Sequence, residues 1–299
     1  MTESFSHVPV MIREVTELLN LKSGATVVDC TLGLGGHAQA MARVVGAEGR
    51  LIGIDQDREA IEKARERLKD FSGRLDIVRS NFRKLDDVLS SLGVSEVDGI
   101  LFDLGVSSLQ LDDAARGFSF RSEGPLDMRM DQDMPVSAFE LINSLSEEEI
   151  GNLLWRYGEE RFSRRIATTI VRARSARAIE TTKDLVDVIL RALPYRVSRD
   201  GVHPATRSFQ AIRIAVNQEL DVLTMALDAA LAHVKVGGRM CVIAFHSLED
   251  RIVKEKFRGF AKEGRAVLLT KKPLRPTDGE AGENPRSRSA RVRALERIG

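Results

Sequence analysis

The sequence predicts an α/β fold in which a mainly parallel sheet is interrupted by an inserted helical block. Up to Asp103, short runs rich in Val, Ile and Leu alternate with helical segments, which is typical of βαβ units. The alternation stops after Gln110, and an apolar run resumes only at Arg239. We therefore expect one sheet whose chain leaves for a second domain and returns.

The size and charge of the chain agree with such an arrangement. Its 299 residues exceed the usual single domain, so two units or one domain with a large insertion are expected. A net charge of +1 argues against indiscriminate nucleic-acid binding over the whole surface. The C-terminus from Arg286 to Arg297 is nevertheless rich in arginine and predicts a local basic surface.

Other classes of protein are disfavoured. The N-terminus lacks a basic region followed by an apolar stretch, and no window approaches a bilayer-spanning length, so we expect a cytoplasmic protein without membrane contact. Cys30 and Cys241 each lie inside an apolar run, where a reduced thiol behaves as a small hydrophobe. We predict no disulfide and no metal site.

Four apolar runs predict the first strands, at residues 25–30, 50–55, 75–79 and 97–103. The first run ends in Asp29 and Cys30, the second in Asp55, and the fourth in Asp103. Open α/β sheets bind ligands at the carboxyl edge of their strands. The sequence therefore gathers carboxylates where a ligand is expected.

The middle of the chain predicts a long loop and then helices. Residues 112–133 form a loop with Gly and Pro that is too long for a simple connection, and such loops are often functional. Residues 137–193 are predicted to be helical, with a capping box from Ser146 to Glu149. Apolar residues at three- and four-residue steps predict one long helix over 208–231.

Three more strands are expected at residues 239–245, 266–270 and 290–297. The last two are joined without a crossover helix, which predicts an antiparallel strand at or near the edge of the sheet. The predicted domains are residues 1–112 with 208–299, which form the ligand-binding sheet, and residues 113–207, which form a helical substrate-recognition insertion between the fourth and fifth strands.

The stretch "DCTLGLGGHA", Asp29–Ala38, predicts a loop against which a cofactor lies. The spacing of Gly33, Gly35 and Ala38, with Asp55 downstream, fits the loose dinucleotide fingerprint, so an NAD-dependent dehydrogenase is one interpretation. Asp29 favours another, because it supplies a carboxylate where a cationic amino group could lie. S-adenosylmethionine carries such a group.

Two later strand ends also favour a methyltransferase. Ser80, Asn81 and Phe82 offer an amide and an aromatic ring with which an adenine could be read and stacked. Asp103 stands where many amino-group methyltransferases place a polar acceptor. The residues thus favour S-adenosylmethionine over NAD, while a non-catalytic RNA-binding or subunit-assembly factor that retains the pocket remains a third alternative.

Seven blocks spread over nearly the whole chain carry a resemblance to a known family. They are "HVPVM" (His7–Met11), "DCTLGLGGHA" (Asp29–Ala38), "VDGILFDLGVSSLQLD" (Val97–Asp112), "RGFSFRSEGPLDMRMD" (Arg116–Asp131), "FQAIRIAVNQEL" (Phe209–Leu220), "AFHSLEDRIVK" (Ala244–Lys254) and "NPRSRSARVR" (Asn284–Arg293). The sequence resembles the bacterial 16S ribosomal RNA cytosine-N4 methyltransferase family, known as RsmH and formerly as MraW.

The resemblance implies a class I, Rossmann-like methyltransferase sheet of about seven strands with an inserted helical domain. It implies methylation of the N4 amino group of one cytidine in the decoding region of 16S ribosomal RNA, with S-adenosylmethionine as the methyl donor. Asp103 is the expected catalytic residue. The expected cofactor contacts are Gly33, Gly35, Gly36, His37, Asp55, Phe82, Asp103 and Gln110.

No familiar motif in the sequence predicts which residues hold the target base. Many amino-group methyltransferases place an aromatic residue three positions after the strand-end acid, whereas here Asp103 is followed by Leu104 to Ser108 without a ring. We expect contacts from His246, from Phe118 in the long loop, and from Arg165. On a helix, Arg161, Arg165 and Arg172 would form an exposed stripe for RNA phosphates.

The assembly of the protein and of its substrate is left open. The sequence does not distinguish naked 16S ribosomal RNA from the small ribosomal subunit as the partner, and it allows a homodimer without requiring one.

Overall fold

The computed structural model describes residues 9–194 and 203–299, which form two compact units. The sheet unit comprises Met1–Gly105 and Leu220–Gly299, and the helical unit comprises Val106–Glu219. These boundaries differ from the predicted ones, which placed residues 106–112 and 208–219 with the sheet. Of the predicted N-terminal block, His7 and Val8 lie outside the described residues.

The sheet unit is built on seven strands in the order β3-β2-β1-β4-β5-β7-β6. The strands are β1 (Thr26–Asp29), β2 (Arg50–Asp55), β3 (Arg74–Arg79), β4 (Val97–Asp103), β5 (Val234–Ala244), β6 (Ala266–Leu268) and β7 (Arg291–Arg297). The first five are mutually parallel, whereas β7 runs antiparallel to both β5 and β6. The class I sheet and its antiparallel strand near the edge are thereby confirmed.

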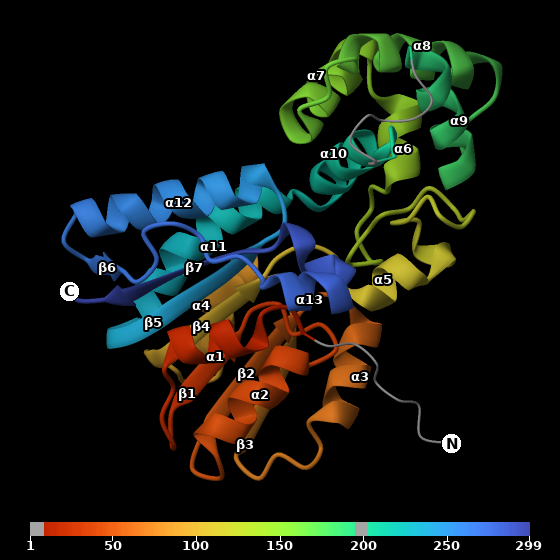
Figure 1. Ribbon diagram of the computed structural model, residues 1–299. Helices are drawn as coiled ribbons and strands as arrows, with labels where there is room; N and C mark the ends of the chain where they lie inside the picture. Colours follow the sequence, from red (N-terminus) through yellow and green to blue (C-terminus); the bar gives the residue numbers. More distant parts are fainter. Residues whose placement is uncertain (1–8, 195–202) are drawn as a thin grey trace. The chain divides into compact units, whose positions relative to one another are not determined.

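Helices cover both faces of this sheet (Figure 1). They are α1 (Ile12–Leu19), α2 (Gly36–Val45), α3 (Arg58–Arg67), α4 (Leu85–Ser91), α11 (Glu219–His233), α12 (Ser247–Lys262) and α13 (Asp278–Glu283), with 3₁₀ turns η1 (Phe82–Lys84) and η3 (Pro285–Ser289). Side chains alternate between two faces along a strand. In β4, Ile100 and Phe102 therefore face α4 and α11, while Leu101 faces α1 and α2.

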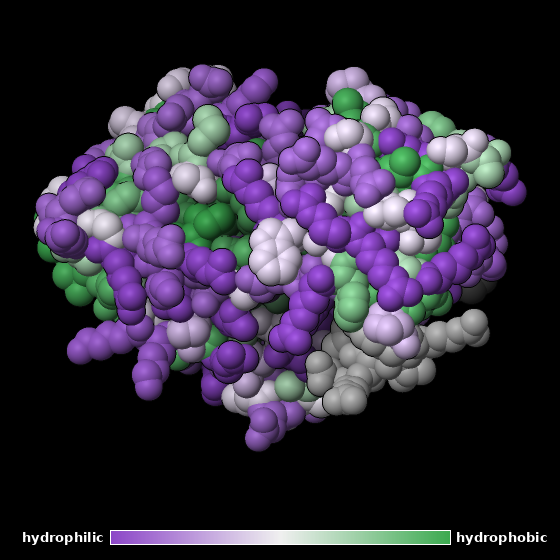
Figure 2. Space-filling view, turned by 90° about the horizontal axis from the view of Figure 1, so that it is seen from above, coloured by the Kyte–Doolittle hydropathy of each residue, from purple (hydrophilic) through white to green (hydrophobic). Residues whose placement is uncertain are grey.

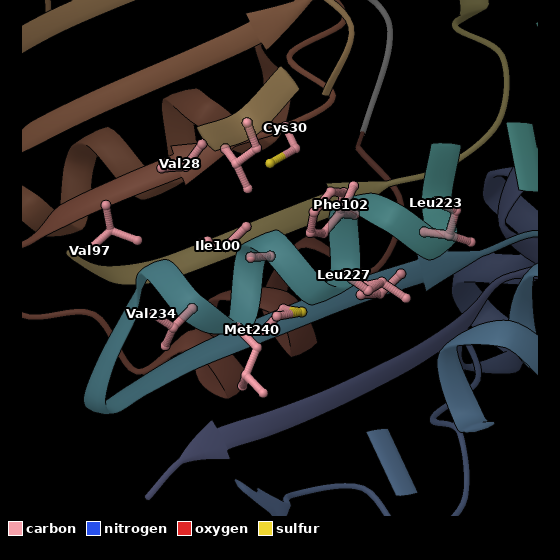
Figure 3. Close-up of a cluster of buried hydrophobic side chains, with 14 of the residues drawn as sticks. Val28, Cys30, Val97, Ile100, Phe102, Leu223, Leu227, Val234 and Met240 are labelled. Carbon is pink, nitrogen blue, oxygen red and sulfur yellow. The ribbon is translucent and has the colours of Figure 1, made fainter. Parts of the chain in front are cut away.

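Figure 3 shows the first of these two core layers. Leu223 and Leu227 of α11 point toward Ile100 and Phe102 of β4, and all four side chains are almost completely buried. Cys30 lies in this layer and Cys241 in the other, and burial raises the pKa of both thiols well above the ordinary value. As predicted, they are packing residues without a disulfide.

The helical unit follows the predicted pattern of one helix after another. Its helices are α5 (Ser108–Asp112), α6 (Ala138–Ser144), α7 (Glu147–Gly158), α8 (Ser163–Ala176), α9 (Thr182–Ala192) and α10 (Thr206–Asn217), with the 3₁₀ turn η2 (Ala114–Arg116). Ser146 and Glu149 form the predicted capping box of α7. The core contains Ile150, Ile166 and Ile170, together with Phe118 from the long loop.

The prediction of one helix over 208–231 is wrong. The helix ends at Asn217 because Gln218 adopts a left-handed conformation with φ of 52°, and α11 begins at Glu219. The Asn217 amide is buried and bonds to the backbone of Met128 and Met130 in the long loop. The apolar stripe is continuous in sequence, but its two halves enter different cores.

Nothing in the described part of the chain forms a helix both long and apolar enough to span a bilayer.

Candidate active site

The glycine loop joins β1 to α2 at the carboxyl edge of the sheet. Gly33 and Gly35 have φ values of 49° and 75°, a left-handed region that L side chains rarely adopt. A Cβ on Gly35 would also lie 3.3 Å from the Cβ of Ala64 in α3. Gly35 is the N-cap of α2 and, as a glycine, provides no side-chain cap. The loop therefore presents bare backbone and a positive helix end to a ligand.

Asp55, at the end of β2, is held rigidly by the loop. Its Oδ2 accepts a hydrogen bond of 2.7 Å from the Gly33 amide, and its Oδ1 accepts one of 2.9 Å from the Asp57 amide. Burial, opposed by these hydrogen bonds, raises the pKa of Asp55 to about 6. The contact of Asp55 with the cofactor stays a prediction.

Asp29, at the end of β1, is a buried acid with an unused oxygen. Its Oδ1 accepts a hydrogen bond of 3.2 Å from the Thr31 amide, whereas its Oδ2 has no hydrogen-bond partner among the described residues. Burial, together with repulsion from Asp55, raises the pKa of Asp29 to about 7. An orphaned carboxylate oxygen inside a protein is costly unless a ligand satisfies it.

Asp103, at the end of β4, has the same character and is more accessible. Its side chain is 27% exposed, its Oδ1 has no hydrogen-bond partner in the described chain, and its Oδ2 lies 3.5 Å from His37 Nε2. The Asp103 amide donates a 2.6 Å bond to the Thr31 hydroxyl, which fixes β4 against the glycine loop. Burial, with repulsion from Asp29 and Glu249, raises the pKa of Asp103 to about 8.

His246 and Glu249 stand at the end of β5, the next strand of the sheet. His246 is the N-cap of α12, and its Nδ1 accepts a 3.3 Å bond from the Glu249 amide. Glu249 is 2% exposed, and its Oε2 accepts bonds from the amides of Phe245 and His246. His246 therefore caps α12, and its predicted contact with the target base stays a prediction.

The sequence interpretation missed two side chains of this cluster. Thr31 links Asp29 to Asp103, and Glu249 adds a fourth acid that repels Asp103. Thr31 could have been suspected because it lies between the strand-end acid and the first glycine. Glu249 carries the signal of a capping residue three positions after His246, but that pattern does not indicate that it also faces Asp103.

The predicted adenine contacts lie at the end of β3. Asn81 caps the short turn η1, and its Nδ2 donates a 2.9 Å bond to Gln56 Oε1, which follows Asp55. Phe82 packs edge to face with Phe102, at a ring-centroid distance of 5.6 Å. Its ring is only partly buried, so stacking on an adenine stays a prediction.

Three predicted site residues belong to the helical unit. Gln110 is 4% exposed and closes the capping box of α5 with Ser107. Phe118 is 7% exposed and packs in the core, with the Arg116 guanidinium 5.8 Å from its ring centroid, so it anchors the long loop to the helical unit. Arg165 lies exposed on α8. Their contacts with cofactor or RNA stay predictions.

The donor set of the sheet unit fits a cationic ligand. Asp29, Asp55, Asp103 and Glu249 surround the loop, and Asp29 and Asp103 each have an oxygen without a partner. A pyrophosphate would add negative charge beside these acids, whereas S-adenosylmethionine carries a sulfonium and an ammonium. The electrostatics therefore disfavour the dehydrogenase interpretation and suit S-adenosylmethionine.

The sheet order, the glycine loop and the acidic strand ends define a class I methyltransferase. The comparison with family models matches residues 4–298 to the MraW methylase family. The chain belongs to the MraW methylase family.

Curated relatives match this chain from end to end. It is 47% identical to ribosomal RNA small subunit methyltransferase H of Brevibacillus brevis, with 99% of each chain covered. It is 48% identical to the protein of the same name from Symbiobacterium thermophilum, over 99% of this chain and 98% of the relative. Among solved structures, an rRNA methylase from Streptococcus thermophilus is similar with a TM-score of 0.48 and 11% identity, over 98% and 100% of the two chains.

Proposed function

We propose that this protein transfers a methyl group from S-adenosylmethionine to the N4 amino nitrogen of one cytidine in the decoding region of 16S ribosomal RNA. Family membership and the names of the relatives support a small-subunit RNA substrate. The observation that carries the chemistry is the pair of orphaned carboxylate oxygens, on Asp29 and Asp103, beside the glycine loop. The choice of N4 and of the decoding region rests on the sequence resemblance.

Different residues of the sheet unit would contact different parts of the cofactor. Asp55 would accept the ribose hydroxyls, Asp29 would face the ammonium of the methionine part, and the backbone from Gly33 to Gly36 would lie against the cofactor. His37, at the start of α2, orients the Asp103 carboxylate. When bound, S-adenosylmethionine supplies an electrophilic methyl group.

Asp103 would act on the acceptor nitrogen. The lone pair of a cytosine amino group is delocalised into the ring, so the nitrogen reacts only when it is oriented and encouraged to pyramidalise. The Asp103 carboxylate, whose side chain is 27% exposed, can accept a hydrogen bond from the amino N–H and hold the nitrogen in line. After transfer, the same carboxylate can take the proton, since its raised pKa makes it a better base than an ordinary aspartate.

RNA phosphates would be bound by arginines of both units. Arg165 and Arg172 are exposed on α8 as predicted, whereas Arg161 is exposed in the turn before this helix. Arg174 on α8 instead bonds the carbonyls of Ile142 and Leu145 at the end of α6. Not every arginine of the C-terminal segment is available at the surface for RNA. Arg293 is buried in an ion pair with Asp250, whereas Arg288 stays exposed.

The direct test is to incubate the protein with labelled S-adenosylmethionine and with small ribosomal subunits that lack the modification, and then to map the labelled nucleotide. We expect one N4-methylated cytidine in the decoding region. A parallel reaction on naked 16S ribosomal RNA identifies the true substrate state. Tight RNA binding without methyl transfer would support the non-catalytic factor instead, and label on another atom or another RNA would contradict the proposal.

Two further expectations depend on this function. A ribosomal RNA substrate places the enzyme in the cytoplasm, which localisation of the full chain would check. The homodimer that the sequence allows stays a prediction, which sedimentation of the purified protein would decide.

A further inference from the structure

An exposed tryptophan stands out on α7 of the helical unit. Trp155 is the one tryptophan of the chain, and 61% of its surface is open to solvent. The buried side of α7 is formed by Ile150, Leu153 and Leu154, which pack in the core without it. Tryptophan combines an apolar ring with a polar N–H and is enriched at interaction surfaces, so this exposed ring is a candidate contact.

A fixed cation lies one helical turn before Trp155. Gly151 and Asn152 share a face of α7 with Trp155 because they precede it by four and three residues. The Arg164 guanidinium lies against Gly151, where even a Cβ would come within 2.8 Å of its Nη1. Arg164 also donates a 2.9 Å bond to Asn152 Oδ1, so its charge is held in place rather than mobile.

More arginines surround the C-terminal end of α7. Arg156, next in the chain, lies 5.2 Å from the centroid of the Tyr157 ring. Arg161 and Arg165 are exposed where the chain enters α8, and α7 packs directly on α8. Arg207 of α10 bonds the Glu159 carbonyl at the end of α7. Glu148 and Glu159 are exposed acids on the same face of α7, and Arg156, Arg161, Arg164 and Arg165 outnumber them, so the sum of these charges is positive.

The face shown in Figure 2 is mainly hydrophilic, with hydrophobic residues in separate patches. We call Trp155 with Arg156, Arg161, Arg164 and Arg165 the Trp155 surface. An aromatic ring among arginines matches single-stranded RNA, whose bases stack on the ring while cations bind the phosphates. A duplex offers phosphates but keeps its bases stacked inside.

We infer that Trp155 is a stacking platform for an unpaired nucleotide of the RNA substrate, flanked by arginines that bind its phosphates. The inference rests on the proposed function, because it assumes an RNA substrate. It adds a contact that neither the glycine loop nor the acidic strand ends supply, and it assigns the helical unit a way to distinguish looped from paired RNA.

The single tryptophan allows a direct test, since all indole fluorescence of the chain comes from Trp155. A single-stranded RNA oligonucleotide of the decoding region should quench this fluorescence on binding, and a duplex of the same sequence should not. In methylation assays, Trp155→Ala should raise KM for RNA about tenfold, in the range of one base–aromatic stack, with kcat and S-adenosylmethionine affinity unchanged. Trp155→Phe should recover most of the loss.

Met225→Ala is the matched control, because Met225 is 54% exposed on α11 and lies between the exposed acids Asp221 and Asp228. It should leave RNA affinity unchanged. Equal quenching by duplex, or a wild-type KM for Trp155→Ala, would overturn the inference while methylation by the wild type still supports the proposed function. A KM effect seen only with assembled subunits, without quenching by RNA, would assign the surface to a ribosomal protein and also overturn it.

Discussion

The proposed catalytic role of Asp103 depends on the residues around it. Asp29, Asp55 and Asp103 lie near the glycine loop at the ends of β1, β2 and β4. Burial is the main cause that raises the pKa of each of them above the ordinary value. Because Asp29 and Glu249 also repel a negative charge on Asp103, the ionised form of Asp103 is unfavourable unless a cation binds nearby. In the proposed mechanism, the positive charge of the sulfonium donor would favour the ionised form of Asp103, which can then act as the base.

Replacing Asp103 by Asn removes the charge while keeping an oxygen that accepts a hydrogen bond. We expect kcat to fall by roughly 10²- to 10⁴-fold, as for loss of a general base, with a much smaller change in S-adenosylmethionine affinity. Turnover and calorimetric binding, measured separately, check this. Asp87→Asn, at an exposed position of α4, is the control and should be silent. Normal turnover of Asp103→Asn would remove Asp103 from the mechanism.

Gly93 is a matched control for Gly35, because it has a similar left-handed φ value and is not among the predicted cofactor contacts. Gly35 and Gly93 have φ values of 75° and 65°, so an alanine at either position should cost about 1–2 kcal/mol of stability. Gly93 faces open space, whereas a Cβ on Gly35 would press on Ala64. Denaturant titration should show both losses, and only Gly35→Ala should also weaken cofactor binding. Equal cofactor affinity in the two variants would contradict the predicted role of the loop.

At this scale the sequence predicted the acids and glycines well, because strand ends and turns have local signals. Asp29, Asp55 and Asp103 lie at strand ends as expected. Thr31 was missed because its partner, the Asp103 amide, is 72 positions away and meets it only when β4 pairs with β1. Long-range pairing of this kind leaves no mark in the residues around Thr31.

Among the elements, α8 presents its arginines as the helical period predicts. Arg165 and Arg172 are exposed on one side while Ile166 and Ile170 are buried on the other. The same periodicity led to the wrong prediction of a single helix over residues 208–231. An apolar stripe indicates that a helix face is buried, but it does not indicate in which hydrophobic core. Gln218 carries no helix-breaking signal, and its left-handed conformation places Phe209 and Leu223 in separate clusters.

The exposed arginines on α8 and just before it should set the salt dependence of RNA binding. We expect Arg161→Glu, Arg165→Glu and Arg172→Glu each to weaken binding and to reduce the slope of log K against log salt by about one for each phosphate that the variant no longer binds. Filter binding over a range of ionic strength measures both quantities. Lys183→Glu, on α9 of the same unit, is the control. Unchanged slopes in all three variants would exclude the stripe as an RNA surface.

For the whole molecule, the acid cluster makes stability depend on pH in an unusual direction. The folded pKa values of Asp55, Asp29 and Asp103 are about 6, 7 and 8, all above the ordinary value of 3.8. The folded state therefore binds more protons than the unfolded state, and stability falls as pH rises from about 4 to about 8. A bound cation should reverse this trend by satisfying the charged carboxylates.

Thermal unfolding at pH 6 and at pH 8.5, chosen to bracket roughly the titration of the cluster, checks the sign. Without cofactor, the midpoint should be lower by a few degrees at the higher pH, and the increase on adding S-adenosylmethionine should be larger there. Asp103→Asn should flatten both effects. A cofactor-induced increase that is independent of pH would show that these carboxylates do not meet the donor's positive charge.

At the scale of the whole chain, the sequence predicted the sheet and the insertion but not the limits of the units. The strands are visible as apolar runs, and the antiparallel β7 follows from the missing crossover. The limits at Gly105 and Glu219 depend on where α5 and α10 pack, which tertiary contacts decide. Nothing in the sequence of the long loop predicted that Arg116 is buried and donates hydrogen bonds to the carbonyls of Arg129 and Met130.

The central claim is that the ends of β1, β2 and β4 hold the methyl donor. A crystal structure of the protein with S-adenosylmethionine tests it most directly. We predict the ribose hydroxyls on Asp55, the ammonium near Asp29, and the sulfonium methyl facing Asp103, with the glycine loop unmoved. A donor bound at another edge of the sheet, or one that leaves Asp29 and Asp103 without contacts, would contradict it.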